Sequence, residues 1–287
     1  MLELKYATGF FETARERYNI KLKREAGEPP PWTTDKQFRQ WRFCHVHREH
    51  DKTTRWFRET VRKHLDELAA TRATVAFRWF NRIETGELIV DLLVDKWDSQ
   101  EAERRLRGVA PIVTGAYIIK GYDGYPKLEG VLKCIDEAFP RLPPMVEKWK
   151  AKPSLEAAWR DLTTLNYLGG FMAYEIVSDL RWTPFLSVAP DILTWANAGP
   201  GCARGLSWTV DGHVGRFGTG PSDQRTMLSL MREILAMSRD EQYWPQKWHT
   251  WEMREVEHWM CECDKYCRAR SGESMKRKFV APRTAYA

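Results

Sequence analysis

Apolar residues recur at intervals of three and four along much of the chain, which is the spacing of one face of an α-helix. The pattern predicts helices over 8–23, 57–68, 128–139, 155–165, 172–180, 227–235 and 253–267. Signals for β-strands are few, and only 86–93 and 116–119 suggest short strands. The pattern therefore predicts a mainly α fold.

Prolines, glycines and one serine mark where these helices are expected to begin and end. The proline-containing stretches 27–31 and 140–144 should end the first and third helices, because proline lacks the backbone donor that a helix needs. Ser154 is a plausible N-cap for the helix that follows it. Seven of the 18 glycines fall within 199–220, so this segment is predicted to be a long irregular loop, and long ordered loops commonly carry function.

A length of 287 residues accommodates one large domain or two small ones, and no linker is evident. We expect a single helical catalytic domain over 1–271 and a basic, flexible tail over 272–287. The net charge of +6 is concentrated at the ends, with +4 within 1–60 and +5 within 268–287. Basic ends indicate a polyanionic partner such as DNA, although a solvated surface would explain them equally simply.

The cellular location is expected to be the cytoplasm, or the host cell cytoplasm if the chain is phage-encoded. No run of eighteen apolar residues exists and the first residues lack the features of a secretory signal, so no membrane partner is predicted. Six cysteines are too few for a disulfide scaffold, which favours a reducing compartment.

Two patterns in the sequence resemble metal-ligating groups, but simpler roles explain both. The three histidines at 45, 47 and 50 have no identifiable carboxylate or cysteine partner. The second pattern is His258, Cys261, Cys263 and Cys267, but it lacks the spacing of a structural zinc site, and its last two cysteines belong to an apolar helix stripe. No metal and no cofactor are therefore predicted. The P-loop pattern is absent, whereas the glycine-rich run 199–205 either exposes backbone donors to a phosphate or forms a tight turn.

The segment 165–173 looks like a helix–hairpin–helix element, whose usual form is L-P-G-[VI]-G-x-x-[TS]-A. Leu165, Leu168, Gly169 and Ala173 fit this form, and Tyr167 replaces its first glycine. In this element a glycine turn lets backbone N–H groups at the start of the second helix face a DNA phosphate. The segment therefore predicts a turn between two helices that touches the DNA backbone through its two adjacent glycines, at positions 169 and 170.

Asp191 follows this element by about a helix and a loop, as the catalytic aspartate does in DNA glycosylases of the helix–hairpin–helix superfamily. The alternative is that Asp191 caps the helix expected to follow it. The lysine of lyase-type glycosylases would fall at Phe171, so β-lyase chemistry is not expected.

Motifs spread over nearly the whole chain resemble the α-glutamyl/putrescinyl thymine pyrophosphorylase family of phages and fungi. They also resemble the helical domain attached to 5-hydroxymethyluracil DNA kinases. The matching segments lie within 10–18, 30–33, 42–56, 115–117, 165–173, 191–201 and 256–266. The absence of a kinase motif favours a stand-alone transferase over a fused kinase.

The resemblance implies a fold related to the helix–hairpin–helix DNA glycosylases and a role in phage DNA hypermodification. The substrate would be double-stranded DNA whose thymine-position bases carry a 5-pyrophosphoryloxymethyl group. The amine of a free amino acid or polyamine would displace the pyrophosphate. A DNA glycosylase acting on a modified pyrimidine, and a non-catalytic DNA-binding module, are the two alternatives.

Residues for this chemistry can be nominated by type. Arg48, Arg55, Lys120 and Arg204 are candidates for binding pyrophosphate, because its departure develops negative charge. Asp191 is the candidate general base, because amines are protonated at neutral pH.

Further candidates cover the base and the pyrimidine ring. Trp56 and Trp195 are candidates for stacking on a flipped base, whereas most of the 14 tryptophans should lie in the core. Cys202 could attack the pyrimidine ring. Should Asp191 not serve as the base, the carboxylates at 175, 262 and 264 are the alternatives.

Overall fold

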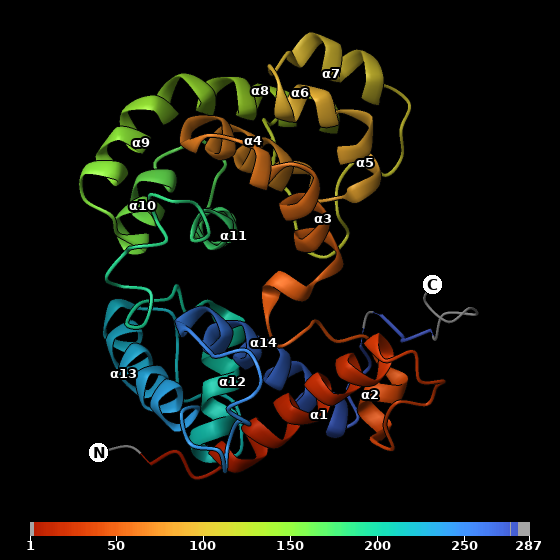
Figure 1. The fold of residues 1–287 in the computed structure, drawn as a ribbon, viewed down its shortest axis with the longest axis vertical. Helices are drawn as coiled ribbons and strands as arrows, with labels where there is room; N and C mark the ends of the chain where they lie inside the picture. Colours follow the sequence, from red (N-terminus) through yellow and green to blue (C-terminus); the bar gives the residue numbers. More distant parts are fainter. Residues whose placement is uncertain (1–2, 276, 281–287) are drawn as a thin grey trace. The chain divides into compact units, whose positions relative to one another are not determined.

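The computed structural model describes residues 3–275 and 277–280 (Figure 1). The described residues form helices, and their only β-type pairing is an isolated bridge between Trp41 and Lys278. The prediction of a mainly α fold is thus confirmed. Backbone contacts divide the chain into two compact units, which are Met1–Asp51 with Leu193–Ala287 (unit 1) and Lys52–Ile192 (unit 2). The assignment of 1–271 to one catalytic domain stays a prediction.

Unit 1 is built around the helices α12 and α14, which pack against each other along their length (Figure 1). Its helices are α1 (Ala7–Glu25), α2 (Lys36–Gln40), η1 (Arg48–His50), α12 (Pro200–Asp211), α13 (Pro221–Met237) and α14 (Met253–Arg270). The predictions of helices over 8–23, 227–235 and 253–267 are confirmed. No described helix is both long enough and apolar enough to cross a bilayer.

The first half of the segment 199–220 is a helix, so its prediction as one long irregular loop is wrong there. α12 occupies its first half and ends at Gly212, whose φ of 75° stops the helix. A Cβ on Gly205 would lie 2.0 Å from the Met260 carbonyl oxygen, and one on Gly201 would lie 2.9 Å from Cys261 Sγ. Two of the glycines are therefore present because α14 approaches closely, and not because the chain turns there.

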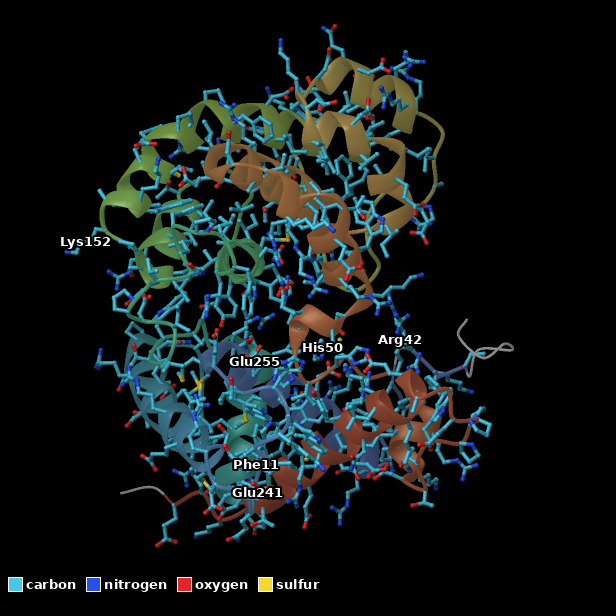
Figure 2. All side chains as sticks on the ribbon, in the orientation of Figure 1. Phe11, Arg42, His50, Lys152, Glu241 and Glu255 are labelled. Carbon is cyan, nitrogen blue, oxygen red and sulfur yellow. The ribbon has the colours of Figure 1, made fainter. Side chains whose placement is uncertain are left out.

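An aromatic core supports α1 within unit 1. Phe11, labelled in Figure 2, lies 5.2 Å from the ring of Phe10 and 5.5 Å from that of Trp251. Trp244 and Trp259 are also fully buried. These rings confirm that most tryptophans near the C-terminus serve the core.

Unit 2 is arranged around α4, which contacts α6, α8, α9 and α11. Its helices are α3 (Lys52–Thr60), η2 (Arg62–His64), α4 (Glu67–Phe80), α5 (Ile83–Leu88), α6 (Val90–Val94), α7 (Ser99–Leu106), α8 (Lys127–Ala138), η3 (Phe139–Arg141), α9 (Leu142–Ala151), α10 (Leu155–Leu162) and α11 (Gly170–Leu180). The helices predicted over 128–139, 155–165 and 172–180 are confirmed in position.

Three predictions for unit 2 are wrong. The helix over 57–68 is broken, because Leu65 is extended and Asp66 caps a new helix by accepting from the Ala69 backbone N–H. The strand over 86–93 is instead covered by α5 and α6, and the residues of 116–119 form no strand. The third predicted helix does end just before the prolines of 140–144, because α8 ends at Ala138. These prolines then begin η3 and α9, since proline is tolerated in the first turn of a helix.

A tight turn joins α10 to α11, as predicted for 165–173. Ser154 caps α10 by accepting from the Ala157 backbone N–H, as expected, and Gly169 is the residue before α11. Tyr167, which replaces a glycine of the hairpin pattern, has a φ of 60°. This left-handed conformation is one that glycine adopts freely. The relation to the DNA glycosylase fold stays a prediction.

Part of the predicted tail lies along residues 40–42. The Phe279 backbone N–H donates to the Gln40 carbonyl at 2.9 Å, and the Arg42 backbone N–H donates to the Arg277 carbonyl at 3.2 Å. Residues 276 and 281–287 of this tail lie outside the described residues.

Candidate functional site

Two motif-bearing segments that are about 200 residues apart in the sequence meet in unit 1. They are the residues leading into η1 and the middle of α14. We call the charged group that forms at their contact the Asp51 cluster, and its members are Arg17, Cys44, Asp51, His258, Glu262 and Lys265.

Local structure places both halves of the Asp51 cluster. Asp51 is the C-cap residue of η1, and its carboxylate Oδ1 accepts a hydrogen bond from the His45 backbone N–H at 2.9 Å. This bond closes residues 45–51 into a compact loop. On α14, residues 258, 262 and 265 are spaced by four and three, so they lie on one face of the helix. His258 Nε2 lies 3.6 Å from Asp51 Oδ2.

Hydrogen bonds tie the two segments together. The Cys44 backbone N–H donates to Glu262 Oε2 at 2.8 Å, and Lys265 Nζ donates to the same oxygen at 2.6 Å. Lys265 also lies over the Phe43 ring, 4.8 Å from its centroid. Glu262 is thus the acceptor that joins the segment before η1 to α14.

Burial and neighbouring charges shift the pKa values of this cluster in different directions. Burial raises the pKa of Asp51 to about 6, and the His45 backbone N–H partly opposes the rise. Burial, Glu262 and Asp51 raise the pKa of the Cys44 thiol well above its ordinary value. Burial also pushes the pKa of Glu262 upward, but Lys265 and His258 together hold it below its ordinary value.

Arg17 supplies a buried positive charge beside these acids. Burial lowers the pKa of its guanidinium, whereas Asp51 and Cys44 act to raise it. Its NH2 group contacts the Phe43 carbonyl at 3.5 Å, and NH1 has no hydrogen-bond partner among the described residues. The cluster therefore brings opposite charges together at partly buried positions, which is typical of functional sites.

Donor atoms suited to a metal ion also come together here. Cys44, Asp51 and His258 each offer one such atom, and the three atoms lie within 4.8 Å of one another. Neither metal-ligating pattern of the sequence contains this combination, because its members come from two distant segments. His258 belongs to the second of those patterns, and nothing in the sequence joined it to Cys44 or Asp51.

Two of the predicted pyrophosphate-binding residues and one predicted stacking residue lie in unit 1. Arg48 is buried in η1, whereas Arg204 is exposed on α12 and pairs with Asp264 at 3.1 Å. Asp264 also accepts from Arg268. Trp195 is only 8% exposed.

The other predicted site residues lie in unit 2. Arg55 is exposed on α3, and Lys120 is exposed in the segment between α7 and α8. Trp56 is partly exposed, with its ring centroid 5.2 Å from that of Phe77. Gly170 begins α11, next to the cap residue of this helix, and its carbonyl accepts from Trp159 Nε1 at 2.8 Å.

Asp191 caps a helix, but a different one from the helix that its sequence position suggested. The described residues directly after Asp191 form turns, so there is no following helix for it to cap. Its Oδ1 accepts the Leu155 backbone N–H at 2.9 Å, and its Oδ2 accepts the Glu156 backbone N–H at 3.0 Å. Ser154 Oγ also donates to Oδ2 at 2.7 Å. The carboxylate thus lies at the N-terminus of α10, where a negative charge is favoured.

Cys202 is not a loop residue, contrary to the expectation that made it a candidate nucleophile. It is fully buried in α12, and its Sγ lies 3.8 Å from Met231 Sδ. Burial raises the pKa of its thiol well above the ordinary value. A buried thiol that stays protonated is a poor nucleophile, so the structure argues against attack of Cys202 on the pyrimidine ring.

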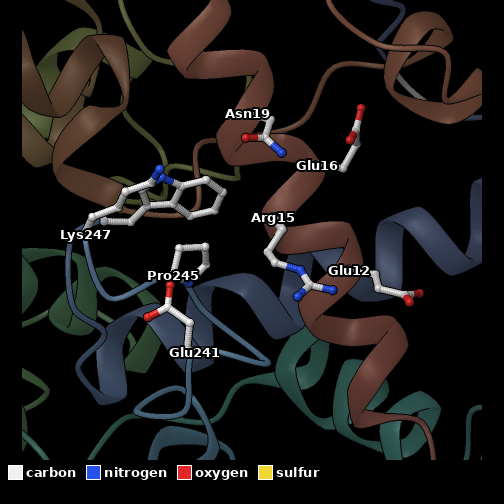
Figure 3. A pocket seen from close by; sticks show the side chains of 8 residues that line it. Glu12, Arg15, Glu16, Asn19, Glu241, Pro245 and Lys247 are labelled. Atoms are coloured by element: carbon white, nitrogen blue, oxygen red, sulfur yellow. The ribbon is translucent and has the colours of Figure 1, made fainter.

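A groove on the surface of unit 1 lies between α1 and the segment 241–248 (Figure 3). Arg15 crosses it and donates to the Gln242 carbonyl at 2.6 Å. Glu12, Glu16 and Lys247 also line it, so both signs of charge are present. The groove contains none of the predicted site residues.

The sequence of this chain is similar to a family of phage DNA-modification proteins. The family described as "5-hmdU DNA kinase, helical domain" matches residues 5–276. The "5-hmdU DNA kinase" of Bacillus phage SP10 is 24% identical over 286 residues, which cover 90% of this chain and 44% of the relative. The chain therefore spans less than half the length of that relative. No solved structure matches it.

Proposed function

Because the chain belongs to the family of the 5-hmdU DNA kinase helical domain, we propose that it is a phage DNA hypermodification enzyme. In this proposal it transfers an amino acid or polyamine onto the pyrophosphorylated 5-hydroxymethyl group of uracil bases in DNA. The observation that carries the proposal is the family match over residues 5–276, joined to a relative named for 5-hmdU in DNA.

The reaction balances as a substitution at the exocyclic carbon. The bond from that carbon to the pyrophosphate oxygen breaks, and pyrophosphate leaves with the electron pair. A new bond forms from the amine nitrogen to the same carbon, and the nitrogen gives up one proton to a base. The pyrimidine lies inside a duplex, so the base is flipped out before reaction.

Specific residues are proposed for each requirement of this reaction. Arg48, Arg55, Lys120 and Arg204 are the proposed cations for pyrophosphate, and guanidinium groups suit this task because they bind phosphate oxygens in pairs. The exposure of Arg204 on α12 supports its assignment.

The unit 2 residues have supporting geometry of their own. Trp56 is the better placed of the two proposed stacking residues, since part of its ring is exposed whereas Trp195 is buried. Gly169 is exposed directly before α11, where backbone N–H groups point outward and favour a phosphate. Asp191 remains the proposed base.

Nucleoside mass spectrometry tests this proposal. DNA containing pyrophosphorylated 5-hydroxymethyluracil is incubated with the protein and with single amino acids or polyamines, and released pyrophosphate is measured in parallel. A heavier nucleoside together with pyrophosphate supports the transferase. Abasic sites would instead identify a glycosylase, and unchanged DNA that is nevertheless bound would identify a binding module.

The salt dependence of DNA binding provides a second arm. Affinity should fall steeply between low and moderate salt, because contacts between basic residues and phosphates release counterions. Removing residues 272–287, which carry part of the basic C-terminal charge, should weaken binding without abolishing turnover. Affinity that is flat over this range would contradict a DNA substrate.

A further inference from the structure

Cys44, Asp51 and His258 form a compact set of three different metal-binding groups. The donor atoms lie within 4.8 Å of one another, although the residues come from the segment before η1, the end of η1 and α14. We propose that these three side chains bind a divalent transition-metal ion, with Zn²⁺ the best match. This site goes beyond the proposed function, which uses no metal.

The chemistry of the donors selects the class of ion. Mg²⁺ and Ca²⁺ take oxygen ligands, so a thiol and an imidazole argue against them. Zn²⁺ accepts sulfur, nitrogen and oxygen together. Three protein ligands with a fourth position open to solvent or substrate are the arrangement of reactive zinc sites.

Surrounding hydrogen bonds already orient the three ligands. Asp51 Oδ1 accepts the His45 backbone N–H at 2.9 Å, so Oδ2 is the oxygen that faces His258. His258 Nε2 lies 3.1 Å from the His45 carbonyl oxygen as well as 3.6 Å from Asp51 Oδ2, so the imidazole ring is held beside both the carboxylate and the segment before η1. The Cys44 backbone N–H is fixed by Glu262.

Accessibility and distance are both compatible with an ion. The side chains of His258 and Asp51 are 14% and 23% exposed, so an ion can enter from solvent. Bonds of about 2.0–2.3 Å in a tetrahedral zinc site separate the ligand atoms by roughly 3.3–3.8 Å. The donor atoms therefore have to close by about 1.5 Å at most. Binding releases the Cys44 thiol proton to solvent and forms the metal–sulfur bond.

Binding of Co²⁺ and Zn²⁺ to full-length protein without a histidine tag tests the proposal. Co²⁺ is expected to bind with one equivalent and to show the charge-transfer absorption that a cobalt–thiolate bond produces. Cys44→Ser should abolish this band and weaken Zn²⁺ binding by at least about tenfold. Asp51→Asn and His258→Gln should weaken Zn²⁺ binding by a similar factor. Cys267 lies on α14, as His258 does, but outside the proposed site. Cys267→Ser is therefore the matched control, and it should keep both the cobalt–thiolate absorption and the Zn²⁺ affinity.

A measurement on the unmodified protein covers the case in which the variants fail to fold. Bound Zn²⁺ should protect Cys44 from alkylation, followed by peptide mass spectrometry, while leaving the alkylation of Cys267 unchanged. Absence of stoichiometric binding, the same cobalt spectrum in Cys44→Ser, or an unprotected Cys44 would overturn the proposal. None of these readouts needs DNA or an amine, so their failure is separate from failure of the transferase.

Discussion

Asp191→Asn distinguishes two roles that the structure brings into direct competition. As a base, Asp191 must take a proton from an ammonium group. As a cap, its two oxygens already accept from Ser154 Oγ and from the Leu155 and Glu156 backbone N–H groups. The asparagine oxygen can serve one side of this arrangement, but its NH₂ group cannot accept a hydrogen bond from the other side.

The two roles predict losses of different kinds. Losing one side of the cap should cost about 1–2 kcal/mol of unfolding free energy. For a chain of this size, that corresponds to a fall in melting temperature of several degrees, on the order of 2–4 °C per kcal/mol. Losing a general base should lower turnover on the order of 10²-fold or more. Turnover is measured by pyrophosphate release at a temperature where both proteins are folded.

Ser154→Ala is the matched control for this experiment. The Ser154 hydroxyl accepts from the Ala157 backbone N–H at 3.1 Å and donates to Asp191, so its removal weakens the same cap and leaves the carboxylate in place. This variant should lose about 1 kcal/mol of stability and keep near-normal turnover. If Asp191→Asn turns over as fast as Ser154→Ala, the base assignment is refuted and capping is the whole role of Asp191.

Three further predictions concern the stability of the fold. Burial raises the pKa of Glu255 to about 7, so the unfolded chain releases this proton first and stability falls as the pH rises from about 4.5 to 7. Glu255→Gln should remove up to about 3 kcal/mol of that fall, measured by urea unfolding at about pH 5 and pH 8, and an unchanged pH slope would contradict the assignment. Arg78→Met removes the guanidinium that binds both carboxylate oxygens of buried Asp179, and it should cost about 3–5 kcal/mol. Adding Asp179→Leu should recover part of this loss, and a double-mutant cycle with no coupling would refute the argument. Gly205→Ala should cost more than about 2 kcal/mol, since its Cβ would meet an α14 carbonyl at 2.0 Å, whereas Gly9→Ala, with open space around it, should be tolerated.

Sequence periodicity predicts the long helices well, because each one buries a stripe of its own residues. It fails where a helix owes its stability to a partner. The glycines in α12 suggest a loop when the sequence is considered alone, but Gly201 and Gly205 are four residues apart and face α14. A short apolar run such as 89–93 is equally ambiguous, because five residues do not distinguish a strand from one turn of a buried helix.

The same limit applies to the candidate sites, where the range of the interaction decides what the sequence reveals. Aspartate is a residue type that commonly caps helices, but the groups that donate hydrogen bonds to Asp191 lie 35 to 37 residues earlier in the chain. Only the structure therefore identifies the helix that it caps. Asp51 and His258 are about 200 residues apart, and no local pattern links a carboxylate at the end of a short helix to an imidazole on the last long one. What the sequence does contain is the spacing of His258, Glu262 and Lys265, which puts three polar groups on one face of a helix with many buried residues. Keeping charged groups partly buried costs free energy unless partners compensate them, and the contacts of Glu262 with Lys265 and with the Cys44 backbone supply that compensation. Polar residues at helical spacing on a largely buried helix are therefore the sequence feature that best indicates a site of this kind.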